Sequence, residues 1–227
     1  MDTATKTLER DIRSGGAPEV ERSDRGRRIA GSLFAAGGAT ILLGIITAEA
    51  LYPAPYFTDT NTISDLGGSL PPNSVVLQPS ATIFDLAMIA SGILLIAATV
   101  FLHRLALRRG LIVAVAMLGV GVLGVGVFPG VRLFPHQLFA LSAFVGGGIA
   151  AVLSARYLRA PGRQFAVGLG VVSLLSLALG IFAIEWGPIA HFGEGGIERW
   201  VAYPVVLWMM LFGGALIGTE PRSTPRR

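Results

Sequence analysis

The sequence contains no cysteine, and only a small share of its residues carries a charge. The missing thiols exclude disulfide bonds, thiolate metal sites and a cysteine nucleophile. Charged residues make up 14% of the chain, whereas soluble domains contain about 25%. Hydrophobic residues make up 52%, and the chain holds three histidines. This composition indicates a protein that lies mostly within a lipid bilayer.

Six apolar segments have the length of about 20 residues that is needed to cross the hydrocarbon core of a bilayer. Pro129, Gly130 and Pro135 interrupt the chain between the third and fourth segments, so these two should form a tight helical hairpin. We therefore expect an all-α polytopic membrane protein with six transmembrane helices in one bundle. The segments are residues 29–51, 81–102, 110–128, 136–153, 165–184 and 197–217.

The basic residues indicate how these helices are oriented. Every lysine and arginine except Arg132 and Arg199 lies in one of the two tails or in the connections after the second and fourth segments. The positive-inside rule makes that side cytoplasmic and predicts a plasma-membrane protein with both termini in the cytoplasm. Residues 1–28 are polar and lack apolar periodicity, which predicts a disordered tail, and residues 218–227 form the second tail. Because the net charge of +4 reflects topology, no nucleic-acid partner is expected.

The acidic residues outside the tails show the opposite bias, because all of them lie at or near the outer side. Asp85 lies about 7 Å inside the second segment at 1.5 Å per residue. An ionisable residue at such a depth normally faces the bundle interior and has a partner. Arg132, Arg199 and His136 are the candidates for that partner. The outer carboxylates are Glu49, Asp59, Asp65, Asp85, Glu185, Glu194 and Glu198, and His136 and His191 lie on the same side.

The first outer connection, residues 52–80, is long and contains too many apolar residues for a solvated linker. We expect it to fold back over the bundle as a cap. Ser64 and Asp65 should bond backbone amides ahead of a turn at Gly67 and Gly68. Arg199 could tie this cap to the bundle by pairing with Asp65 or Asp85.

A motif in this connection, Asn61-Thr62-Ile63-Ser64-Asp65-Leu66-Gly67-Gly68, carries a family resemblance. It resembles the Ser-acid-Leu-Gly signature of a bacterial and archaeal family of multi-pass membrane proteins catalogued as domain of unknown function 998. The resemblance continues in Phe128-Pro129, in His136 and in Gly196-Ile197-Glu198-Arg199, and covers about residues 29–217. Asp65 stands where the family more often has Glu, which keeps the charge. The resemblance implies a multi-pass fold and motif residues on the outer face, but no particular activity.

Glycines in the third segment match a dinucleotide-binding fingerprint, Gly119-x-Gly121-x-x-Gly124. That fingerprint requires a preceding strand, whereas this one lies inside an apolar helix. Close packing of helices explains these glycines, and Gly146-Gly147-Gly148 in the fourth segment, far better than nucleotide binding does.

The outer polar residues lead to three functional hypotheses. The first is a protein that binds membrane lipid, another amphiphile or a partner membrane protein. The second is a membrane-embedded lipid hydrolase or transferase that uses Asp85, His136 and Glu198, and the third is a small transporter. A metal site is not favoured, its candidate ligands being His136, His191 and Asp85, and no cofactor is expected. The predicted binding residues are Asn61, Ser64, Asp65, Asp85, Arg132, His136, Glu198 and Arg199.

Overall fold

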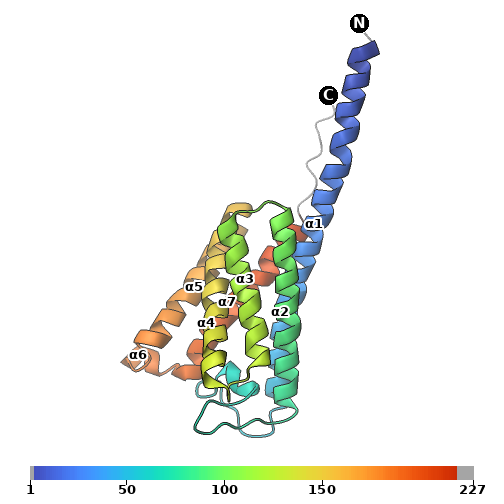
Figure 1. Cartoon of the computed structure of the whole chain (residues 1–227). Helices are drawn as coiled ribbons and strands as arrows, with labels where there is room; N and C mark the ends of the chain where they lie inside the picture. Colours follow the sequence, from blue (N-terminus) through green and yellow to red (C-terminus); the bar gives the residue numbers. More distant parts are fainter. Residues whose placement is uncertain (1–2, 219–227) are drawn as a thin grey trace.

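The computed structural model describes residues 3–218, with side chains from residue 21 onward, and consists of helices and connections over that range. Six of its helices are long and apolar enough to cross a membrane, and they pack into one bundle (Figure 1). The predicted six-helix, multi-pass fold is therefore confirmed. The long helices are α1 Thr3–Ala50, α2 Ser80–Arg104, α3 Arg109–Val127, α4 Leu133–Ser154, α5 Gly162–Phe182 and α7 Gly193–Gly218. The short ones are η1 Ile63–Leu66, η2 Ala155–Tyr157 and α6 Gly187–Ala190.

The structure differs from the sequence-based expectation at the start of α1. A disordered tail is predicted for residues 1–28, whereas the helix begins at Thr3 and runs without a break into the first apolar segment. The tail contains six arginines and three glutamates, and both residue types have high helix propensity. The apolar part of α1 also supplies a helical nucleus from which such residues can extend the helix. The predicted second tail lies outside the described residues from residue 219 onward.

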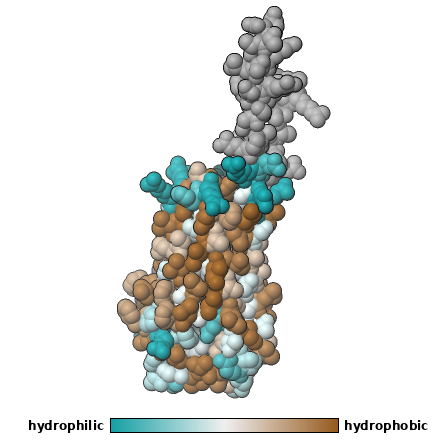
Figure 2. Space-filling view, turned by 45° about the vertical axis from the view of Figure 1, so that its right-hand side comes forward, coloured by the Kyte–Doolittle hydropathy of each residue, from teal (hydrophilic) through white to brown (hydrophobic). Residues whose placement is uncertain are grey.

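The connections divide between two ends of the bundle (Figure 1). One end, which we call the loop end, carries the α1–α2 loop (residues 51–79), the α3–α4 turn (residues 128–132) and α6. The opposite end, which we call the arginine end, carries the α2–α3 and α4–α5 connections, with Arg104, Arg108, Arg109, Arg156 and Arg159. Figure 2 shows hydrophilic side chains at this end and an apolar surface along the bundle. This surface matches the expected band of lipid contact.

Glycines allow α3 to pack closely against its two neighbours. A Cβ atom on Gly124 would lie 2.1 Å from Cγ of Phe139 on α4, and one on Gly121 would lie 2.4 Å from the Ala143 nitrogen. Gly119 lies against Leu95 and its neighbour on α2. The glycines that resemble a nucleotide-binding motif thus serve helix packing, as predicted.

The helix α7 crosses the bundle interior despite an internal proline. Trp208 and Phe212 are fully buried and pack with Phe34 of α1. Pro204 removes one backbone donor from α7. Ser173 of α5 donates to the Val201 carbonyl nearby, at 2.8 Å. This bond joins α5 to α7 at the site where the proline weakens the helix.

Candidate functional site

The motif segment of the α1–α2 loop forms η1, which is closed by a reciprocal cap. The Thr62 amide donates to Oδ2 of Asp65 at 2.9 Å, and the Asp65 amide donates to Oγ1 of Thr62 at 3.2 Å. Asn61 adds a longer bond from Nδ2 to Asp65 Oδ2, at 3.5 Å. Because short polar side chains satisfy the free amides of a helix start, Asp65 shapes the loop in the manner expected from the sequence.

Glu198 of α7 holds the start of η1 against the bundle. Its Oε2 accepts the amides of Ile63 and Ser64, the latter at 3.4 Å, and its Oε1 accepts the Ser64 hydroxyl at 2.8 Å. A carboxylate is favoured there because the amides at a helix start carry partial positive charge. Ser64 therefore bonds a side chain of α7 rather than the loop amides that the sequence predicts.

The neighbouring residue, Arg199, binds a second part of the loop. It is 9% exposed and makes five hydrogen bonds, which its planar fork of donors allows. The acceptors are Oε1 of Glu49 at 2.7 Å, Oη of Tyr56 at 2.8 Å and the carbonyls of Thr58, Asn61 and Gly195 at 3.0, 2.8 and 2.9 Å.

The predicted ion-pair partners of Arg199 are wrong, although it does tie the loop to the bundle. The sequence favours Asp65 or Asp85, whereas the structure pairs Arg199 with Glu49 in the last turn of α1. The side chain of Asp65 is used in the cap of η1. Asp85, which belongs to α2, lies beneath Gly67 of the loop. The sequence analysis assigned no partner to Glu49. Its carboxylate lies so close to the end of a span that this position could have identified it as the partner of Arg199.

Tyr56 completes this cluster, and sequence reasoning also missed it. Its hydroxyl donates to the Thr62 carbonyl at 2.8 Å, and its ring lies 5.5 Å from the Arg199 guanidinium carbon. Burial raises the pKa of Tyr56 above its ordinary value, although Arg199 acts to lower it. The hydroxyl thus stays protonated and can donate.

Two glycines at the start of α7 let the loop backbone lie directly on this helix. Gly193 has a φ of +65°, and a Cβ atom there would lie 2.1 Å from the Asp59 oxygen. A Cβ atom on Gly195 would lie 2.2 Å from the Asn61 oxygen. Larger residues at either position would push the loop away from the bundle.

Asp85 and His136 lie at the loop end but do not join the cluster. A Cβ atom on Gly67 would lie 2.7 Å from Oδ1 of Asp85, and this oxygen is buried without a partner among the described residues. His136 is 3% exposed, and its Nδ1 bonds the Phe128 carbonyl at 2.7 Å. Since a carbonyl can only accept, Nδ1 carries the proton. The buried Nε2 has no partner among the described side chains.

None of the predicted partners of Asp85 bonds it in the described part of the chain. Arg132 precedes α4 and is exposed. Nor does any hydrogen bond or ion pair there join two of the candidate catalytic residues Asp85, His136 and Glu198.

The candidate metal ligands are also separate. Over the described residues, no group of three or more histidine or acidic side chains could hold a metal ion. His191 is exposed at the end of α6, where its Nδ1 bonds the Gly187 carbonyl at 2.6 Å.

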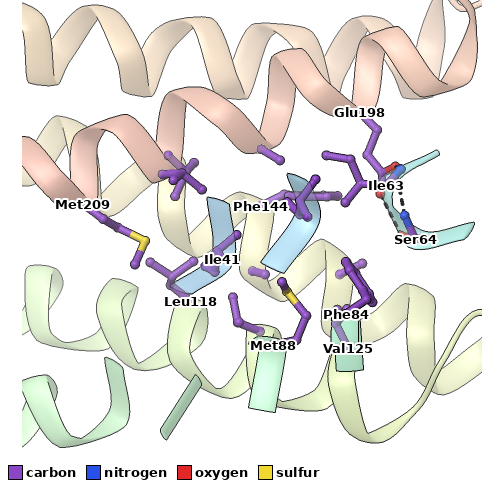
Figure 3. A pocket seen from close by; sticks show the side chains of 17 residues that line it. Ile41, Ile63, Ser64, Phe84, Met88, Leu118, Val125, Phe144, Glu198 and Met209 are labelled. Atoms are coloured by element: carbon purple, nitrogen blue, oxygen red, sulfur yellow. Dashed lines mark hydrogen bonds between the residues drawn. The ribbon is translucent and has the colours of Figure 1, made fainter. Parts of the chain in front are cut away.

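An apolar pocket lies inside the bundle, directly against η1 (Figure 3). It is an open-sided cavity of about 70 Å³, and residues from α1, α2, α3, α4 and α7 line it. Among the described residues that line it, only Ser64 and Glu198 are polar, and they are hydrogen bonded to each other at one end. The sequence indicated these two polar residues but not the pocket that they close. The apolar lining includes Ile41, Phe84, Met88, Leu118, Phe144 and Met209.

Comparison with known proteins identifies a family. No curated protein and no solved structure matches the chain. The sequence profile of a family described as "Protein of unknown function (DUF998)" matches residues 34–215. The match includes the α1–α2 loop and the start of α7, which together close the pocket. The chain is a multi-pass membrane protein that belongs to the DUF998 family.

Proposed function

We propose that this protein binds an amphiphile from the surrounding bilayer, with the apolar chain in the pocket and the polar end at Ser64 and Glu198. The observation that carries this proposal is the lining of the pocket, which is apolar except at the end closed by η1. Binding sites for small molecules commonly combine apolar walls with a few polar groups that fix the orientation of the ligand. A membrane amphiphile with a single alkyl chain and a polar end meets both requirements.

We propose further that the loop end faces the outside of the plasma membrane and that both termini are cytoplasmic. The gathering of the connecting arginines at the opposite end supports this orientation (Figure 2), since short cytoplasmic connections are enriched in basic residues. The ligand would then be drawn from the outer leaflet.

We place the entrance for the ligand between α4 and α7. Phe144 of α4 and Ala202 of α7 line the pocket, whereas α5 contributes no lining residue. In Figure 1, α5 diverges from α4 toward α6, while its last turns stay against the start of α7, where a Cβ atom on Gly180 would lie 2.8 Å from Ile197. A chain could pass from lipid into the pocket between α4 and α7 while the loop stays in place.

The other hypotheses have less support. A hydrolase or transferase would need Asp85, His136 and Glu198 within hydrogen-bond reach of one another, and no such bond joins them among the described side chains. A transporter would need a polar path toward the arginine end. The pocket instead continues from Glu198 along apolar residues to Met209.

The proposal can be tested with two variants in which an alanine is replaced by phenylalanine. Ala202→Phe places a ring in the pocket, while Ala178→Phe adds the same ring on the exposed face of α5. We expect native mass spectrometry of protein purified in mild detergent to detect a bound amphiphile in the wild type and in Ala178→Phe. Its occupancy should fall about tenfold or more in Ala202→Phe, since a buried clash costs about 1–3 kcal/mol. Equal occupancy in all three proteins, or none in the wild type, would contradict the proposal.

A further inference from the structure

We infer that the pocket selects an amphiphile whose polar end donates hydrogen bonds, namely an alcohol or an amine, and that it rejects carboxylates and phosphates. This inference rests on the proposed function and narrows it to a chemical class of ligand. It follows from which hydrogen-bonding groups at the closed end of the pocket are already used.

The donors at this end are all engaged by Glu198. The amides of Ile63 and Ser64 both donate to Oε2, and the single hydroxyl hydrogen of Ser64 is donated to Oε1. A carboxylate offers about four acceptor positions and a hydroxyl oxygen offers two. Oε1 of Glu198 receives one bond, so it can accept another, and Oγ of Ser64 can also accept. The polar end of the pocket therefore offers acceptors and no free donor.

The nearest cation cannot reverse this preference. Arg199 does not line the pocket. Its donors are directed to Glu49, to Tyr56 and to carbonyls of the loop and of α7. Recruiting it for a ligand would break contacts that hold the loop. The remaining lining residues are apolar and supply neither charge nor donors.

The consequences differ sharply for the two kinds of polar end. A carboxylate or phosphate would lie unpaired beside Glu198 in an apolar cavity, where like charges repel strongly and a buried charge is costly. A hydroxyl would satisfy one of the free acceptor positions. An ammonium would donate to both Glu198 and Ser64, and its bond to the carboxylate would be charge-assisted.

The length of the pocket suggests suitable probes. Its lining follows α7 from Glu198 to Met209, which is about 16 Å at 1.5 Å per residue, so a long alkyl chain can lie along it and emerge through the open side. Dodecylamine, dodecanol and dodecanoic acid share this chain and differ only at the polar end. Near pH 7, the amine is cationic and the acid is anionic.

The test measures how each probe displaces the co-purified amphiphile from the full chain in a nonionic detergent, and how it shifts the Tm. We expect the amine and the alcohol to bind at least about tenfold more tightly than the acid. Ala202→Phe should respond to none of them. Glu198→Gln should reduce the advantage of the amine over the alcohol; if that variant does not fold, the three probes on the wild type still decide the question.

The outcomes separate this inference from the proposed function. If the acid displaces the amphiphile as well as the amine does, the pocket binds amphiphiles but the preference for donors is wrong. If no amphiphile co-purifies and none of the probes binds, both the proposed function and this inference are wrong.

Discussion

Arg199 shows how one side chain can determine the path of a long loop. Its five hydrogen bonds reach α1, its own helix and three residues of the α1–α2 loop. Most of the acceptors are backbone carbonyls, which water would otherwise have to satisfy. The loop is therefore held by its backbone, so that many different side chains along it would be compatible with the same path.

Replacing Arg199 by Lys should destabilise the protein although the charge is kept. A lysine has three donors on a flexible stem and cannot reproduce the planar fork, so we expect at least two carbonyls to lose their partner. Each buried unpaired group costs about 1–3 kcal/mol. The loss should appear as a lower Tm and as faster proteolysis within the α1–α2 loop.

Arg132→Lys provides the matched control, because Arg132 is exposed and caps no helix with its side chain. It should leave both the Tm and the rate of proteolysis unchanged. If the two lysine variants behaved alike, the loop would not depend on the contacts of Arg199.

At the scale of the helices, the stability of the bundle depends on glycines that face a neighbour. Gly124→Ala should destabilise the α3–α4 pair by about 1–3 kcal/mol, because the added Cβ would meet the Phe139 ring at 2.1 Å. The expected readout is a lower Tm in detergent. Gly168→Ala on α5 is the control, since a Cβ atom there meets nothing within 4 Å. That control should be neutral or stabilising by up to about 1 kcal/mol, and a similar loss in both variants would contradict the packing argument.

The helices themselves were predictable from the sequence because their signal is local. A run of about 20 apolar residues is enough to identify a span, and all but the first helix begin and end within about one turn of the predicted segments. The tail before α1 was misread since apolar periodicity is absent there. Its helical form depends on propensity and on continuity with the span.

The site was harder to predict than the helices because its contacts join distant parts of the chain. The order of the apolar segments placed Ser64, Glu198 and Arg199 at the same end of the bundle. It could not show whether Glu49, Asp65 or Asp85 is the partner of Arg199. That choice depends on how α1 and α7 face each other. The pocket was missed for a similar reason, since its walls come from five helices and none of them has an unusual sequence.

At the scale of the whole molecule, the orientation in the membrane can be tested directly. The wild-type chain has no cysteine, so a single introduced thiol reports on one position. Asn73 lies exposed in the α1–α2 loop, and Ala160 lies exposed in the α4–α5 connection. In intact cells, a membrane-impermeant maleimide should label Asn73→Cys but not Ala160→Cys, because arginine-rich connections remain in the cytoplasm.

Permeabilised cells serve as the control for this experiment, since both cysteines should then react. Labelling of Ala160→Cys alone in intact cells would reverse the proposed orientation. Labelling of both variants in intact cells would contradict the opposite placement of the loop end and the arginine end.

The adjacent positions of Glu198 and Arg199 have a consequence for how the ligand would be supplied. These two residues fasten different parts of the same loop, so the loop cannot lift at one point without straining the other. Under the proposed function, exchange through the side of the bundle would make the bilayer the solvent of the ligand. Occupancy would follow the mole fraction of that amphiphile among the membrane lipids, and the protein would respond to a change in lipid composition even when the aqueous concentration stayed constant.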